Sequence, residues 1–232
     1  WVMKLAVRKY FPSIDHGCLL GLVRETVGDA RLLEVIDRIV ASGDGIHPES
    51  RELDWFPGDT LWTPVDRPRG LPIGNLTSQL FANVYLGPLD QYVKRELGCR
   101  AYLRYMDDLV FFGRDRAELA GWRECVTAFL CRWRLRVHPD KCYVARCEQG
   151  TAYLGFRVFP DHRLLLGRGV KRYGRRLQQM RRDYGEAAIG VPRVRQSVQS
   201  WIGHVKHGDT WALRQSMLEG SAFVRREAAA DG

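Results

Sequence analysis

The sequence lacks the features that mark membrane and secreted proteins. No run of about 18 consecutive apolar residues occurs along its 232 residues, so no segment is expected to span a membrane. No secretory signal opens the chain, and the expected compartment is therefore the cytoplasm. The chain begins with Trp1 in a run that already has the composition of a core strand, so we expect further residues before it in the full-length protein.

Cysteine pairs at metal-binding spacing are also absent. The six cysteines contain no CxxC pair, which favours reduced, buried side chains over disulfides or a zinc site. They are Cys18, Cys99, Cys125, Cys131, Cys142 and Cys147. Positive charge, by contrast, is in excess: 36 Lys and Arg against 27 Asp and Glu give a net charge of +9. Such an excess attracts polyanions, usually nucleic acid, although it also serves simple solubility.

The stretch 101–113 is the most informative part of the sequence. Two runs rich in aromatic and β-branched residues, 102–106 and 109–112, flank the adjacent acids Asp107 and Asp108. This pattern predicts a β-hairpin with two carboxylates at its tip. Two ionised carboxylates this close repel each other unless a cation lies between them, and Mg²⁺ prefers such oxygen ligands. The alternative is a solvated turn, because Asp is common in turns.

The N-terminal segment predicts a strand followed by a helix. Residues 1–7 form a strongly β-prone apolar run, and Pro12 imposes a turn after it. Ser13 or Asp15 is placed to cap a helix that extends to about residue 27.

Two further helices are expected before the hairpin, near 32–40 and from about 75 to 97. The apolar stripe expected on the second of these comprises Leu76, Leu80, Val84, Leu89 and Val93. Residues 42–70 are rich in Gly, Pro and acids and predict irregular structure. Residues 69–79 form a loop that opens the later helix, with Asn75 or Thr77 as its cap. Free amide groups at such a start suit a nucleotide or a template base, and an ordinary loop-to-helix junction is the alternative.

After the hairpin, the sequence predicts a helix at 115–133 and a short strand at 135–137 that precedes a turn carrying Lys141. Residues 143–145 and 153–159 are expected to pair as a second hairpin. Lys141, beside the acidic hairpin, is placed to donate a proton to a leaving pyrophosphate. Without that context it would be a solvated turn residue.

From about residue 170 the sequence becomes basic and helical. One helix is broken near Pro192, and two more are expected at 193–207 and 210–219. Basic helices with interleaved aromatic residues track a phosphate backbone, or form a solvated face. Trp201 is expected in the core.

Four segments in order and spacing resemble the palm and thumb of a reverse transcriptase. Residues 105–108 (Tyr-Met-Asp-Asp) match the family's catalytic YxDD hairpin, and residues 4–16 resemble its first palm motif. Residues 138–141 (His-Pro-Asp-Lys) resemble the motif bearing the proposed general acid, and 153–156 (Tyr-Leu-Gly-Phe) resemble the primer-grip hairpin.

The resemblance implies an α+β fold: a right-hand polymerase palm, with an antiparallel sheet backed by helices, and a C-terminal helical thumb. The expected organisation is a palm with remaining fingers elements at 1–166, including the irregular insert 42–70. A basic thumb at 167–222 and a frayed tail at 223–232 follow.

In this family the reaction is attack of a primer 3′-hydroxyl on the α-phosphate of a dNTP, with two Mg²⁺ ions. The resemblance assigns Asp107, Asp108 and the Val7 carbonyl to Mg²⁺, Lys141 to protonation of pyrophosphate, and Phe11 to a steric gate against a 2′-hydroxyl. The residues it assigns to nucleotide or template binding are Arg8, Tyr10, Phe11, Ile73, Gly74, Ser78 and Gln79, and those of the primer grip are Leu154, Gly155 and Phe156.

A finer resemblance concerns residues 73–79 (Ile-Gly-Asn-Leu-Thr-Ser-Gln). Most reverse transcriptases carry Gln-Gly at the start of this motif and Pro after the Ser. The form with Ile73 and Gln79 is similar to the enzymes of diversity-generating retroelements, which copy a template-repeat RNA with errors opposite adenine. The implied partners are an RNA template, a cDNA primer, dNTPs and a basic accessory variability protein, with no membrane, in a bacterial, archaeal or phage-encoded system.

Ala6 departs from the family pattern, which has an aspartate at this position. That carboxylate bridges both metal ions, so its loss predicts a severe loss of rate with the fold retained. Asp15 lies beyond the turn at Pro12 and is not expected to replace it. The alternatives are a catalytically inactive nucleic-acid-binding protein with the reverse transcriptase fold, or an enzyme of the group II intron or retron type.

Overall fold

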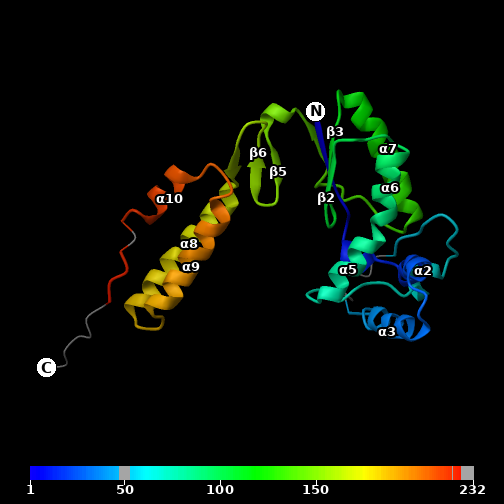
Figure 1. Cartoon of the computed structure of the whole chain (residues 1–232), viewed down its shortest axis with the longest axis horizontal. Helices are drawn as coiled ribbons and strands as arrows, with labels where there is room; N and C mark the ends of the chain where they lie inside the picture. The colour runs from blue at the N-terminus through cyan, green and yellow to red at the C-terminus, as the bar shows by residue number, and fades with distance from the viewer. Residues whose placement is uncertain (47–52, 221, 226–232) are drawn as a thin grey trace. The chain divides into compact units, whose positions relative to one another are not determined.

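The computed structural model describes residues 1–46, 53–220 and 222–225, and its elements are labelled in Figure 1. The chain divides into two compact units, Trp1–Ala145 and Arg146–Gly232. The division therefore falls earlier than the boundary at residue 166 that was expected from the resemblance.

The first unit contains a four-stranded antiparallel sheet in the order β2-β3-β1-β4. Its strands are β1 (Val2–Ala6), β2 (Tyr102–Tyr105), β3 (Asp108–Phe112) and β4 (Tyr143–Ala145). Met3 and Leu5 on β1 are fully buried in the core, and Lys4 between them projects from the other face. The alternation follows from the two-residue period of a strand. The predicted first strand and the predicted hairpin are both confirmed.

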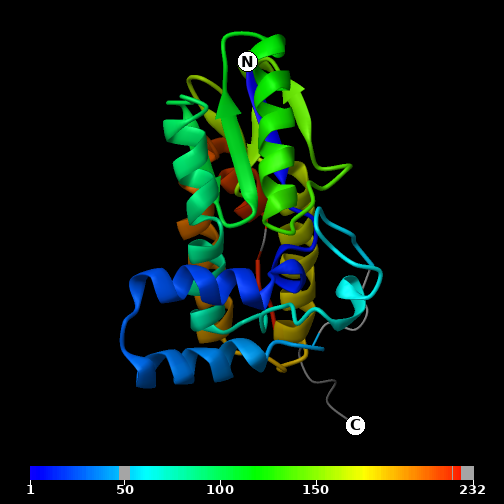
Figure 2. The same ribbon diagram turned by 90° about the vertical axis from the view of Figure 1, so that its right-hand side faces the viewer.

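Seven helices are described in the first unit. They are α1 (Tyr10–Ser13), α2 (His16–Thr26), α3 (Ala30–Ala41), α4 (Thr63–Asp66), α5 (Leu76–Tyr85), α6 (Gly87–Arg95) and α7 (Arg116–Arg132). Asp15, Asp29 and Asp115 each accept a hydrogen bond from a first-turn amide and cap α2, α3 and α7. Buried residues of α6 and α7 share one core with β1 and β3, and Figure 2 shows these helices alongside the strands.

The single helix predicted from about residue 75 to 97 is wrong, because the structure has two helices that meet at Leu86. Pro88 has no amide hydrogen to continue the ladder, so it begins a new helix instead. The predicted apolar stripe is wrong in its first half: Leu76 and Leu80 are 80% and 60% exposed. The buried face of α5 is formed by Ser78, Phe81, Ala82 and Tyr85.

The pairing predicted between 143–145 and 153–159 is also wrong. β4 pairs with β1, so it belongs to the first sheet. The strand predicted at 135–137 is reduced to a single bridge between Val7 and Val137. Short strands carry little information about their partners, since pairing is decided by distant residues. In the part of 42–70 that the structure describes, α4 is the one regular element, as expected; residues 47–52 lie outside the described residues.

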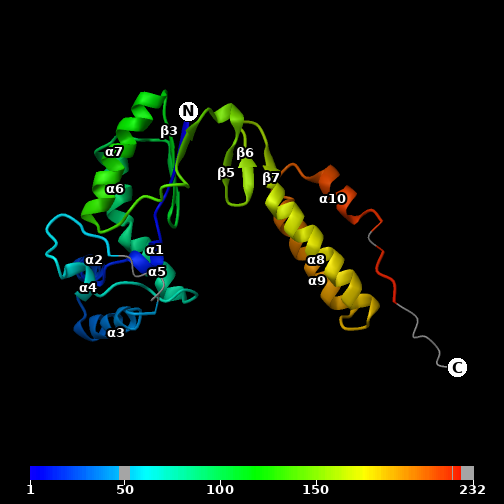
Figure 3. The same ribbon diagram turned by 180° about the vertical axis from the view of Figure 1, so that it is seen from behind.

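The second unit combines a three-stranded antiparallel sheet with helices (Figure 3). Its elements are η2 (Cys147–Gln149), β5 (Thr151–Tyr153), β6 (Phe156–Val158), β7 (Arg163–Leu165), α8 (Gly167–Gly185), α9 (Val191–Val205) and α10 (Trp211–Leu218). The three predicted helices are confirmed. Tyr173, Leu177 and Met180 of α8 pack with Trp201 and Val205 of α9, so Trp201 lies in the core as predicted.

The described part of the chain contains no helix with the length and apolar character needed to cross a membrane. All six cysteines are free thiols, but the expectation that they are buried is confirmed only for Cys99, because the other five are partly exposed. The predicted tail falls largely outside the described residues, because 226–232 are not among them.

Candidate active site

A two-residue turn joins β2 to β3 and places two carboxylates side by side. Tyr105 pairs with Asp108, which leaves Met106 and Asp107 as the turn. Met106 adopts a left-handed conformation with φ of 55°. A non-glycine residue rarely takes this conformation, so the surrounding structure must stabilise the turn.

The register of β1 brings position 6 against the acidic turn. Ala6 lies directly opposite Asp108, and the Val7 amide donates to the Asp107 carbonyl at 3.1 Å. Residues that face each other across two antiparallel strands project from the same side of the sheet. The methyl group of Ala6 therefore lies on the same face as the Asp108 carboxylate.

Lys4, two residues before Ala6 on the same face, supplies positive charge to the turn. Its Nζ lies 3.1 Å from Asp108 Oδ2, and its side chain is 15% exposed. Burial raises the pKa of Asp107, and the neighbouring charge of Asp108 raises this pKa further. The Asp107 backbone amide, Lys141 and Lys4 act in the opposite direction. The charge of Lys141, in the turn that the sequence predicted, thus lowers the pKa of Asp107.

The hairpin is held to α6 by a network that sequence reasoning missed. Arg104 donates through Nε and Nη2 to the Asp90 carboxylate at 2.6–3.1 Å, and through Nη1 to Asn83 Oδ1 at 3.0 Å. Tyr102 donates its hydroxyl to the same carboxylate at 2.9 Å. Arg104 Nη1 also reaches the carbonyl of Met106 at 3.5 Å. Asp90 and Arg104 are 14 residues apart and lie on different elements, so neither helix nor strand periodicity indicates the pairing.

Phe11 lies in α1, directly after the bridge at Val7. Its ring is half-buried and packs edge-on against Tyr10, with 5.8 Å between centroids. Tyr10 is buried and donates its hydroxyl to the Ala82 carbonyl. The Phe11 carbonyl accepts from the amide of Leu71 at 3.0 Å. This bond ties α1 to the start of the loop that contains Ile73.

The loop before α5 presents some of its predicted residues to solvent and buries one. Ile73 is 68% exposed, Gln79 is exposed, and Gly74 has φ of 102°, which favours glycine. Ser78 instead is 1% exposed, and its hydroxyl has no hydrogen-bond partner in the described structure. Arg8 pairs with Asp54 at 2.5 Å.

The comparison with family models decides the assignment. Residues 1–158, about two thirds of the chain, match the model described as reverse transcriptase (RNA-dependent DNA polymerase). This chain belongs to that family. Among curated proteins it is similar to Protein YkfC of Escherichia coli (strain K12), with 24% identity over 194 residues that cover 68% of this chain and 46% of the relative. The chain thus spans less than half the length of that relative.

Reverse transcriptases generally use Mg²⁺, and the residues of this one offer a reduced set of ligands. Asp107 and Asp108 are hard oxygen donors, and the Val7 carbonyl accepts no hydrogen bond from any described residue. Over the described ranges, no group of three or more His, Cys, Asp and Glu side chains is placed to hold a metal. These oxygens are of the type that Mg²⁺ prefers, and position 6, an alanine, adds no carboxylate to them.

Asp15 does not replace the missing carboxylate of the reverse transcriptase. Its Oδ1 caps α2 through the Cys18 amide at 2.8 Å, and its Oδ2 lies 3.5 Å from Arg67 and 3.7 Å from Arg134. It is 6% exposed and thus occupied elsewhere, as its position beyond Pro12 suggested.

The predicted primer-grip residues lie in the second unit, at the turn between β5 and β6. Leu154 and Gly155 have φ of 47° and 90°, and Leu154 is 47% exposed. Phe156 is buried, with its ring 5.3 Å from that of His204. The turn therefore presents an apolar side chain at its tip.

Proposed function

We propose that this chain is the palm and thumb of an RNA-directed DNA polymerase from a diversity-generating retroelement, and that Ala6 severely impairs its nucleotidyl transfer. One observation carries the proposal: the turn with Asp107 and Asp108 lies directly opposite position 6 in the sheet. In this family the side chain at that position completes the metal site, and here it is a methyl group.

The chain's own residues would bind and orient the substrates. Asp107, Asp108 and the Val7 carbonyl would hold Mg²⁺, which when bound offsets the charge that develops on the phosphate oxygens. Phe11, held against Tyr10, would exclude a 2′-hydroxyl from the sugar site. Lys141 would donate a proton to the leaving pyrophosphate. The second unit, with Leu154, would serve as primer grip and thumb.

The Lys4–Asp108 ion pair supports the proposed impairment. With no carboxylate at position 6, the Lys4 ammonium is the described cation in contact with Asp108. A metal ion at this carboxylate would have to compete with a partly buried lysine. Electrostatic stabilisation of the transition state commonly contributes most to catalysis of this kind, so the loss of one bridging ligand is expected to reduce the rate by orders of magnitude.

Ala6→Asp tests the proposal. The variant places a carboxylate beside Asp108, and primer extension with Mg²⁺ on an RNA template should rise by about 100-fold or more over the parent. Ala6→Asn has the same size without the charge and should not restore extension. Mg²⁺ should also raise the melting temperature of Ala6→Asp more than that of Ala6→Asn, because a ligand stabilises the state it binds. Equal extension by the parent and Ala6→Asp would refute the impairment.

The retroelement assignment rests on the loop before α5. Ile73 and Gln79 are both exposed there, so they are available to a template base or an incoming nucleotide. We infer that these two side chains loosen the pocket that holds the templating adenine and its partner. A basic accessory variability protein would be the partner of such an enzyme, and its template would be a repeat RNA.

Ile73→Gln with Gln79→Pro tests this inference in the Ala6→Asp background. The double change should lower the error rate opposite adenine and leave the error rate opposite the other bases nearly unchanged. Proline at 79 also removes the weak hydrogen bond from the Gln79 amide to the Asn75 carbonyl, which is 3.4 Å long. Ile73→Gln alone therefore serves as the control with an intact helix start. Unchanged error rates in both variants would remove the basis for the retroelement assignment.

A catalytically silent nucleic-acid-binding protein is the second candidate. The same Lys4–Asp108 pair favours it, since a stable internal ion pair leaves the fold intact without metal. Salt-sensitive binding of an RNA–DNA duplex, with no incorporation by the parent or by Ala6→Asp, would select this candidate.

A further inference from the structure

A pocket in the second unit combines positive charge with buried polar groups. It has a volume of about 620 Å³ and lies between the start of α8, the side of α9 and the β5–β6 turn. Its lining includes Arg168, Arg172 and Arg176, which are spaced one helical turn apart and therefore project from one side of α8. None of the three forms an ion pair with a described residue.

Two hydroxyl groups in the wall of this pocket have no partner among the described residues. They belong to Tyr173, which is 6% exposed, and Ser197, which is 8% exposed. A buried hydroxyl without an acceptor costs about 1–3 kcal/mol, so such groups are rarely left unsatisfied. Burial raises the pKa of Tyr173, which keeps its hydroxyl protonated and able to donate. Both hydroxyls are therefore able to donate to a bound acceptor, since no described residue supplies one.

The start of α8 adds amide donors to the same pocket. The residue before it, Leu166, provides no side-chain cap, and the amides of Gly167 and Arg168 donate to no described acceptor. The helix has 19 residues, and its N-terminus carries a partial positive charge. Amides, arginines and hydroxyls in one pocket are the donor set for a phosphate group.

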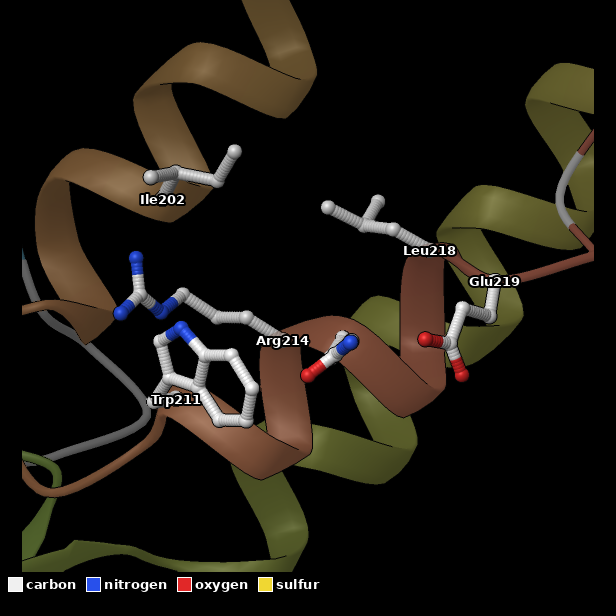
Figure 4. A pocket seen from close by; sticks show the side chains of 6 residues that line it. Ile202, Trp211, Arg214, Leu218 and Glu219 are labelled. Atoms are coloured by element: carbon white, nitrogen blue, oxygen red, sulfur yellow. The ribbon is translucent and has the colours of Figure 1, made fainter.

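A neighbouring pocket lacks these properties. It has a volume of about 430 Å³, lies between α9 and α10, and is lined by Ile202, Trp211, Leu218 and three polar residues (Figure 4). Figure 4 shows the Arg214 side chain extended alongside the Trp211 ring, and Arg214 Nε already donates to the Thr210 carbonyl at 3.4 Å. Glu219 places a negative charge in its wall. Phosphate is therefore expected in the first pocket and not in the second.

We propose that the pocket on α8 binds a phosphate ester, with Arg172 as its ionic partner and Tyr173 and Ser197 as hydrogen-bond donors. The phosphate belongs either to a nucleic-acid strand bound by the chain or to a free nucleotide. Binding of a phosphate from a nucleic-acid strand rests on the proposed function, whereas binding of a free nucleotide does not. The stacked rings of Tyr173 and Trp201, 4.1 Å apart and parallel, hold the tyrosine in place.

Tyr173→Phe is the most direct variant, because it removes one unpartnered hydroxyl and keeps the stacked ring. Its melting temperature without ligand should equal or exceed that of the parent, since an unsatisfied group is removed. Ser197→Ala should behave in the same way. Arg172→Gln removes the ionic partner. Arg181→Gln is the matched control, because it removes the same charge from an exposed position of α8 that lies outside the pocket.

Binding is measured on the full chain without divalent cations, by fluorescence anisotropy with a labelled RNA–DNA heteroduplex and by calorimetry with a 5′-mononucleotide. If the strand supplies the phosphate, Arg172→Gln and Tyr173→Phe weaken heteroduplex binding about five- to tenfold, and Arg181→Gln weakens it less than about twofold. The slope of the logarithm of the heteroduplex binding constant against the logarithm of the salt concentration falls in magnitude by about one in Arg172→Gln. In Tyr173→Phe this slope is unchanged.

If a free nucleotide supplies it, the mononucleotide binds the parent, and the two variants abolish that binding without changing the heteroduplex affinity. Equal weakening by Arg172→Gln and Arg181→Gln, with no mononucleotide binding, would overturn the site. These measurements involve no catalysis, so failure of Ala6→Asp to extend a primer would leave their outcome unaffected.

Discussion

Asp107 carries the clearest electrostatic signature in the proposed active site. Its pKa is raised by burial and then by the charge of Asp108. In the pH range between the pKa of the unfolded chain and the higher pKa of the folded state, the folded protein binds more protons. The stability contributed by this group is therefore lost as the pH rises through that range. Such a cost at neutral pH is typical of a carboxylate kept for function.

Asp107→Asn should accordingly stabilise the first unit above that pH range and have no effect well below it. Urea unfolding at several pH values measures the change. Asp108→Asn is the control, because Asp108 pairs with Lys4 and its replacement should not stabilise the protein. If the free energy of unfolding of Asp107→Asn did not exceed that of the parent at neutral pH, the ionised Asp107 carboxylate would not destabilise the folded protein.

For single residues of the candidate site, the sequence predicted the position correctly wherever the signal lay in a short local motif. The acid pair, the turn that carries it and the alanine at position 6, where the family pattern has an aspartate, are all visible in short motifs. The Lys4–Asp108 contact was not predicted, because it depends on the register between β1 and β3. The burial of Ser78 was also not predicted, since Leu76 and Leu80 suggested a different face of the helix.

The hairpin depends on contacts with α6, the helix that precedes it in the sequence. Arg104 of β2 is 12% exposed and binds Asp90 of α6 through two nitrogens, with Tyr102 on the same carboxylate. Asp90→Ala leaves a partly buried guanidinium without its main partner and should cost about 2 kcal/mol of unfolding free energy. A double-mutant cycle with Arg104→Met should give a coupling energy of about 1–3 kcal/mol.

The exposed pair Glu34–Arg38 on α3 is the matched control for that cycle. Its side chains are 64% and 78% exposed, so Glu34→Ala should cost less than about 0.5 kcal/mol. If Asp90→Ala and Glu34→Ala lowered the unfolding free energy equally, Asp90 would not be needed to hold the hairpin. In the Ala6→Asp background, Asp90→Ala should also reduce primer extension, because Arg104 reaches the carbonyl of Met106 in the turn that carries Asp107.

Element types were predicted more reliably than element partners. The helices capped by Asp15 and Asp115 were found as expected, since a cap and an apolar period are local signals. Pro88 is also a local signal, and its position inside a long apolar pattern should have indicated the break. The pairing of β4 with β1 has no local signal, because a three-residue strand fits either sheet.

At the scale of the whole molecule, the described residues form two hydrophobic cores. One contains residues of β1, β3, α6 and α7, and the other is built from α8 and α9. The composition change near residue 170 predicted two parts, but the strands before α8 belong with the second part. Separate cores are expected to unfold in separate transitions.

Scanning calorimetry of the full chain with one core variant at a time tests this independence. Leu130→Ala in the first core and Leu177→Ala in the second remove side chains that are 0% and 5% exposed, and each should cost about 2–5 kcal/mol. Each variant should lower one transition by about 10 °C and leave the other in place. Leu80→Ala, at a position 60% exposed, should shift neither. A single transition that both core variants lower together would mean that the two units fold as one, and that the stability of the β2–β3 hairpin depends on the basic helices.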